Sequence, residues 1–119
     1  MNFDNFTIKA QQALQQAVDR AQQNGQQAIT PVHLLAGVLA VGENVTKFIF
    51  GKLGVNERSL QAAVNQELMH QPRVSGGTSP YLDQEANDVA LKAQSFAQKA
   101  GDTYVGLEPL LQALLEVKS

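Results

Sequence analysis

The sequence of 119 residues contains no cysteine and no tryptophan, and it has only four prolines. Without cysteine, neither a disulfide framework nor thiolate chemistry is available. The longest apolar runs are far shorter than the roughly 18 residues that a membrane-spanning helix requires, and the first residues, MNFDNFT, lack the basic and apolar regions of a secretory signal. We therefore expect a cytoplasmic protein with no membrane partner.

The charge balance is also unremarkable in size and distribution. The formal net charge is −2, and acidic and basic residues are interspersed along the chain. This pattern argues against a nucleic-acid partner, which would favour a basic face. A chain of this length can bury roughly two-thirds of its unfolded surface, so we expect a single domain over residues 1–119.

The strongest helical signal lies at 29–39, where the sequence reads ITPVHLLAGVL. Thr30 can cap a helix, and Pro31 suits the first helical position because its missing N–H would have no partner there. Leu34, Leu35 and Val38 then recur at helical spacing and form an apolar stripe that must be buried.

The same pattern returns 76 positions later. The offset aligns seven identical pairs without a gap: Ala10 and Ala86, Ala17 and Ala93, Ala21 and Ala97, Gly25 and Gly101, Leu34 and Leu110, Leu35 and Leu111, Leu39 and Leu115. These pairs fall on apolar helix positions or on the glycine that ends a helix. We interpret them as an internal duplication, the alternative being chance similarity between helices rich in alanine and leucine.

Six helices are predicted from periodicity and capping residues, and they define an all-α fold. They lie at about 5–24, 30–41, 44–53, 56–68 and 82–100, with the last one starting at about 107. Asn44 and Asn56 are the expected caps of the third and fourth helices, and residues 70–80 form the one linker.

The predicted organisation is a tandem repeat of a four-helix unit. Repeat one covers about 4–69, and a partial repeat two covers about 81–119, cut after two helices. A third helix of repeat two would start at position 120, so we expect the chain to be a fragment. Apolar surface on the last two helices would then be exposed or covered by another molecule.

No catalytic constellation is recognisable. Residues 37–44 have the glycine spacing of a phosphate-binding loop, but they end in Glu-Asn where Lys-Ser/Thr would be needed. His33 has no metal-ligating partner at helical spacing, so we interpret it as a packed, hydrogen-bonded histidine. Asp102 and Glu108 flank the connection 101–109 and are either solvated loop residues or part of a site.

Four segments together resemble a known family: NFTIKAQQAL at 5–14, NGQQAITPVHLLAGVL at 24–39, KLGVN at 52–56 and AGDTYVGLEPLL at 100–111. They are similar to the Clp N-terminal (repeat) domain, and most similar to the N-domains of the ClpB disaggregases, which are hexameric AAA+ ATPases. The resemblance covers essentially the whole chain.

The resemblance implies a chaperone domain that receives substrate and has no catalytic site or cofactor of its own. ATP and magnesium would belong to ATPase modules elsewhere in the parent homohexamer, which acts in protein disaggregation and the stress response with the DnaK chaperone system. A groove between helices would bind apolar segments of unfolded or aggregated polypeptides. The family's binding positions map onto Thr7, Asp102 and Glu108, whereas two groove leucines of the family are replaced by Ala90 and Pro109.

Two other functions are alternatives for a chain of this kind. An N-domain of the ClpA or ClpC type would dock adaptor proteins for a protease-associated unfoldase. A small enzyme would require converging titratable groups in one pocket, and the sequence offers only scattered carboxylates.

Overall fold

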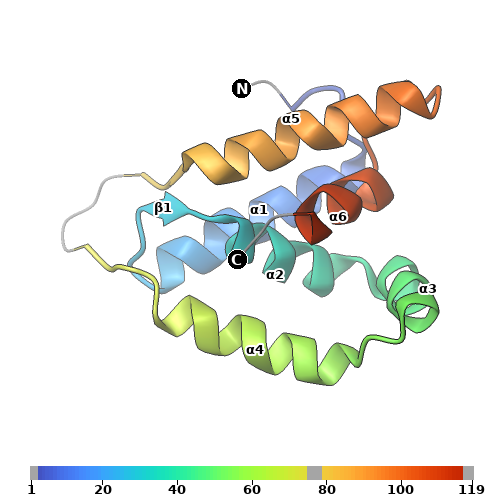
Figure 1. Cartoon of the computed structure of the whole chain (residues 1–119). Coiled ribbons are helices and arrows are strands. Elements are labelled where there is room, and N and C mark those ends of the chain that lie inside the picture. Colours follow the sequence, from blue (N-terminus) through green and yellow to red (C-terminus); the bar gives the residue numbers. More distant parts are fainter. Residues whose placement is uncertain (1–2, 75–78, 117–119) are drawn as a thin grey trace.

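A computed structural model describes residues 3–74 and 79–116, and these residues are mostly helical (Figure 1). The elements follow in this order: α1 (Ile8–Gln23), β1 (Ala28–Ile29), α2 (Pro31–Val41), α3 (Glu43–Leu53), α4 (Glu57–Met69), β2 (Tyr81–Leu82), α5 (Gln84–Lys99) and α6 (Leu107–Leu115). In Figure 1, α5 crosses the top and α4 the bottom, with α2 between them.

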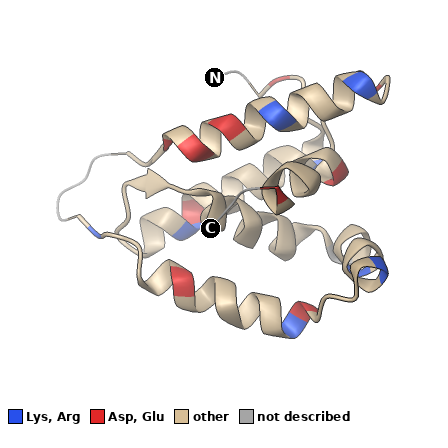
Figure 2. Ribbon diagram, in the orientation of Figure 1, with Lys and Arg blue, Asp and Glu red and all other residues tan. Residues whose placement is uncertain are grey.

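Helix α2 is the centre of the domain and contacts each of the other helices in the described part of the chain. It carries no Asp, Glu, Lys or Arg, whereas both signs of charge are scattered over the other helices (Figure 2). Its residues Leu34 and Val38 are fully buried. The predicted burial of the apolar stripe is therefore confirmed at Leu34 and Val38, whereas Leu35 is partly buried.

The packing of α1 on α2 depends on small residues. The inward face of α1 consists mainly of alanines, and Ala10, Ala13 and Ala17 are fully buried there. A Cβ placed on Gly37 of α2 would lie only 2.1 Å from the carbonyl oxygen of Ala13, far closer than a normal contact. The two backbones therefore touch directly, as the alanine-rich face predicts.

Both long helices end in the same way. Gly25 follows α1 with φ +67°, and Gly101 follows α5 with φ +79°. After each glycine, the next N–H reaches back to the last helical turn: Gln26 donates to the Ala21 carbonyl at 2.8 Å, and Asp102 donates to that of Ala97 at 2.9 Å. The left-handed conformation is what turns the chain sharply there, and it favours glycine.

Two short pairings of extended backbone join the two halves of the chain. Strands β1 and β2 are parallel, with Ile29 opposite Leu82, and a separate parallel bridge joins Phe6 to Val105. Phe6 lies 76 positions before Leu82, and Val105 lies 76 positions after Ile29. Periodicity missed these pairings because two residues are too few to show the alternation of a strand.

Several predicted details are wrong. Leu82 lies in β2 and not in the fifth helix, and α3 begins at Glu43, so Asn44 is not its cap. Residues 75–78 of the predicted linker lie outside the described part of the chain.

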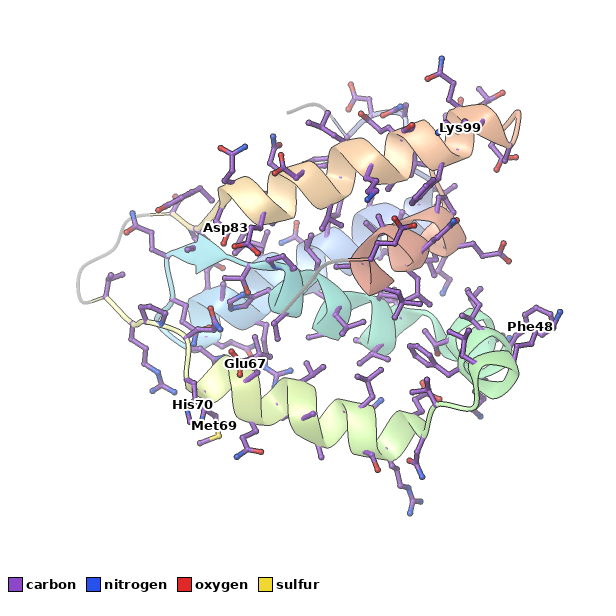
Figure 3. All side chains as sticks on the ribbon, in the orientation of Figure 1. Phe48, Glu67, Met69, His70, Asp83 and Lys99 are labelled. Atoms are coloured by element: carbon purple, nitrogen blue, oxygen red, sulfur yellow. The ribbon has the colours of Figure 1, made fainter. Side chains whose placement is uncertain are left out.

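The buried side of α3 does not include all of its large apolar residues. Phe48 and Leu53 are 59% and 57% exposed, and Phe50 is buried instead. Phe48 points away from the body of the domain (Figure 3), and the Lys52 amino group lies 4.8 Å from the centre of its ring. Contacts with α2 decide which side of α3 is covered, and helical spacing alone does not reveal that choice.

The Gly37 contact leads to a stability prediction. Gly37→Ala should lower the free energy of unfolding by about 1–3 kcal/mol or more, because the added methyl group must push α1 and α2 apart. Thermal or urea unfolding followed by circular dichroism measures the loss.

Gly51 provides the matched control. It lies inside α3, and nothing approaches the position of its missing Cβ within 4 Å. Gly51→Ala should therefore stabilise the protein by about 0.5–1 kcal/mol through helix propensity. Equal effects of the two substitutions would contradict direct backbone contact at Gly37.

Candidate functional site

A surface groove lies where the start of α1, the start of α3 and the connection from α5 to α6 meet. We call it the 102–109 groove, and its volume is about 490 Å³. Its lining residues are Thr7, Lys9, Val45, Asp102, Thr103, Tyr104, Gly106, Leu107, Glu108 and Pro109.

The backbone around this groove is held in place on both sides. Thr7 is the N-cap of α1, where its hydroxyl accepts from the Ala10 N–H at 3.1 Å. The Thr7 N–H donates to the Val105 carbonyl at 2.9 Å, and the Val105 N–H donates to the Asn5 carbonyl at 2.8 Å. These bonds fix the connection 101–106 against the start of α1.

Four of the five predicted site residues therefore come together. Thr7, Asp102, Glu108 and Pro109 all line the groove, with both carboxylates exposed to solvent. Glu108 lies in the first turn of α6, where the helix dipole stabilises a negative charge. Ala90 is not brought to the others, because it is fully buried on the inward face of α5.

Other residues of the groove were not predicted from the sequence. Lys9, Val45, Tyr104 and Leu107 line it, and Val45 comes from a helix more than fifty residues away in the chain. Nothing in the local sequence of α3 indicates that it lies beside the α5–α6 connection. Lys9, Tyr104 and Leu107 fall inside the family-like segments at 5–14 and 100–111, and this was the available signal for them.

A second hollow adjoins the groove. It has a volume of about 510 Å³ and shares Lys9, Val45 and Leu107 with the groove. Its remaining lining comes from α1, the end of α2 and the start of α3: Gln12, Ala40, Val41, Gly42 and Asn44. Together the two hollows form a shallow, mixed apolar and polar trough.

His33 is confirmed as a packed, hydrogen-bonded histidine. Its side chain is fully buried, its Nδ1 accepts from the Thr30 N–H at 3.0 Å, and its Nε2 lies 2.7 Å from Oε1 of Gln26. The amide nitrogen of Gln26 donates in turn to the Leu68 carbonyl at 2.6 Å. This network ties the start of α2 to the end of α4.

Burial lowers the pKa of His33 below its ordinary value near 6.5. The Asp83 carboxylate at the start of α5 (labelled in Figure 3) opposes this shift, and the Arg20 guanidinium adds to it. Since Nδ1 accepts a hydrogen bond, the folded protein holds the neutral ring.

No group of three or more His, Cys, Asp or Glu residues in the described part of the chain could hold a metal ion. Residues 37–44 lie mostly within α2 and α3 and do not form a phosphate-binding loop. Over the described ranges, no single helix is long and apolar enough to span a membrane, although α2 and residues 44–53 together pass by length and composition across a 113° bend.

These features define a mostly helical domain with a shallow surface trough. Comparison with known proteins identifies the class: the family model of the Clp repeat (R) N-terminal domain matches residues 5–119. The chain belongs to this family, whose domains are non-catalytic parts of AAA+ chaperones.

Two curated relatives are ClpB chaperone proteins. The chain is 53% identical over 119 residues to the one from Bacteroides thetaiotaomicron, covering 100% of this chain and 14% of the relative. It is 46% identical over 118 residues to the one from Porphyromonas gingivalis, covering 99% and 14%. The chain thus spans about one-seventh of the length of these relatives.

Solved structures share the fold. The N-terminal domain of Hsp104 from Candida albicans superposes with a TM-score of 0.80 at 25% identity, over 95% of this chain and 75% of that one. The N-terminal domain of the ClpV1 ATPase from Escherichia coli gives a TM-score of 0.85 at 25% identity, over 96% and 69%. These likenesses place the chain among N-terminal domains of Clp-type ATPases.

The neutral state of buried His33 predicts a pH dependence of stability. Because its folded pKa is lowered, the unfolded chain takes up a proton as the pH falls below about 6.5 while the folded chain does not. The free energy of unfolding should therefore decrease from pH 7 toward pH 5. Urea unfolding at a series of pH values measures this decrease.

His33→Gln should flatten this part of the pH profile, although it weakens the network and lowers stability at pH 7. His70→Gln is the control, since His70 is the exposed cap residue after α4 and should leave the profile steep. If the free energy of unfolding changed as steeply with pH in His33→Gln as in the unmodified chain, the buried ring would not be the cause of the pH dependence.

Proposed function

We propose that this chain is the substrate-receiving N-terminal domain of a ClpB-type protein disaggregase, and that the 102–109 groove binds apolar segments of unfolded or aggregated polypeptides. The observation that carries the proposal is the convergence of Thr7, Asp102, Glu108 and Pro109 on one open groove. The identity to ClpB chaperones supports the type of parent protein.

The physical character of the groove suits a weak and permissive binder. Val45, Leu107 and Pro109 provide apolar surface, and each square ångström that a bound segment buries contributes roughly 25 cal/mol. A shallow surface of this kind accepts varied side chains without a demanding fit. Several copies in one assembly would raise the apparent affinity through multivalency.

The proposal extends to the parent protein. We infer a cytoplasmic homohexamer whose ATPase modules bind ATP and magnesium and which works with the DnaK chaperone system. We also infer that the two halves of the domain derive from a duplication. The equal 16-residue lengths of α1 and α5, and their starts at residues 8 and 84, support that origin.

The carboxylates of the groove give the functional test. Replacing both Asp102 and Glu108 by Ala should weaken binding to casein, used as an unfolded probe protein, without lowering the melting temperature. Both side chains are exposed, so their loss removes contacts with the bound segment and leaves the core intact. Fluorescence anisotropy of labelled casein measures the binding.

A matched control removes the same charge elsewhere. Glu85 and Asp88 are exposed near the start of α5, the end of that helix farthest from the groove, and their double replacement by Ala should leave casein binding unchanged. If the double variant at Asp102 and Glu108 bound casein as tightly as the unmodified chain, these carboxylates would not belong to the binding site. Binding only to a folded adaptor protein would favour an adaptor-docking domain.

A further inference from the structure

Another hollow lies where the last turns of α1 meet α2 and α4. We call it the Arg20 hollow, and its volume is about 250 Å³. It shares no lining residue with the 102–109 groove and only Ala40 with the hollow beside that groove. Pockets for drug-sized molecules usually measure roughly 300–1,000 Å³, so the Arg20 hollow suits a smaller group, about the size of one residue.

The floor of the Arg20 hollow is apolar. Leu39 and Val64 are buried there, and beside them lie the short side chains of Ala36 and Ala40, the second of which is exposed. A small aliphatic group placed on this floor would lose contact with water on one side, which favours its binding.

The rim of the hollow is polar and carries a single charge. Arg20 is the only charged residue among those that line it, and its Nη2 donates to Oδ1 of Asn65 at 2.8 Å. This bond uses one of the five N–H donors of the guanidinium and holds the group toward α4. Gln61 lies one turn before Asn65 on the same helix and also lines the hollow.

The guanidinium of Arg20 has no carboxylate partner within salt-bridge distance in the described ranges. The one salt bridge found among residues 3–74 and 79–116 joins Lys92 to Glu116 at 2.9 Å. The carboxylate of the neighbouring Asp19 accepts from the Gln15 amide at 3.0 Å. Because Arg20 is half-buried, its charge is screened less than that of a fully exposed cation. An oriented guanidinium of this kind matches the two oxygens of a carboxylate.

We propose that the Arg20 hollow binds a carboxylate joined to a small aliphatic group, with Arg20 and Gln61 donating to the carboxylate and the apolar floor receiving the aliphatic group. A polypeptide presents this chemistry in two ways, as a chain end whose last residue is aliphatic or as an acidic side chain beside an aliphatic residue. The inference goes beyond the proposed function, because the hollow and the 102–109 groove have no lining residue in common.

Three short acetylated peptides with the same Ser/Gly-rich body test the proposal by NMR titration of the ¹⁵N-labelled chain. The first ends in valine with a free carboxylate, the second ends in valine amide, and the third is amidated and contains an internal Glu-Val pair. The first peptide should produce saturable shifts of the Arg20 Nε–H and Gln61 side-chain amide signals. The second should bind roughly three- to tenfold more weakly, because it has no charged acceptor.

The third peptide identifies the source of the carboxylate. Affinity equal to that of the first peptide would support a site that also accepts acidic side chains. Affinity as low as that of the second would support a site for chain ends alone.

Variants of Arg20 test its part in binding. Arg20→Gln should weaken binding of the first peptide roughly three- to tenfold, and Arg20→Lys should weaken it less, because lysine keeps the charge but loses the planar fork. Lys99→Gln is the matched control. It removes one exposed cation at the end of α5 (labelled in Figure 3) and should leave the affinity unchanged.

Gln61→Glu is a second variant, and it leaves Arg20 and its bond to Asn65 in place. Gln61 is exposed on α4, so the substitution should leave the core intact. The new carboxylate should pair with Arg20 and weaken binding of the first peptide. Thermal unfolding of each variant verifies that the fold is retained.

Equal affinities for the free-carboxylate and amide peptides would overturn the carboxylate site, and so would an unchanged affinity in Arg20→Gln. The absence of saturable shifts with the first peptide would overturn the hollow as a binding site. Casein binding by the 102–109 groove is measured separately, so either proposal can fail without the other.

Discussion

The direct backbone contact between α1 and α2 at Gly37 is the constraint on which the rest of the domain depends. Because alanines face a glycine there, the helices approach more closely than larger side chains would allow, and α2 can sit deep enough to contact all the other described helices. A helix placed this centrally cannot carry unpaired charge, and α2 carries none. Its buried histidine is accommodated only because Thr30 and Gln26 satisfy both ring nitrogens.

The groove is a consequence of how the two halves are joined. The Phe6–Val105 bridge holds the α5–α6 connection against the start of α1, and the left-handed glycine after α5 begins that connection with a sharp turn. Side chains that alternate along this fixed segment then point either into the core, as Val105 does, or toward the groove, as Tyr104 does. A rigid rim of this kind suits the binding role that we propose for the groove.

Much of the local structure could be predicted from the sequence. The cap residues Thr30 and Asn56, the glycines that end the helices and the alanine-rich faces each act within a few residues of the chain, so their patterns can be recognised without coordinates. The interpretation of His33 was also confirmed, because a lone histidine in an apolar helix is normally packed and hydrogen-bonded. The family resemblance rested on motifs of the same local kind, and it was confirmed.

Helix positions and the class of domain could be read from the residues alone, because propensity, capping and small-residue spacing are properties of short segments. The packing of distant segments had to be known to see that Phe50 and not Phe48 is buried, that Ala90 lies in the core, and that Val45 and Lys9 share a groove with residues 102–109. These outcomes depend on which surfaces distant segments present to one another. Neither helical periodicity nor a short strand pairing shows which surfaces those are.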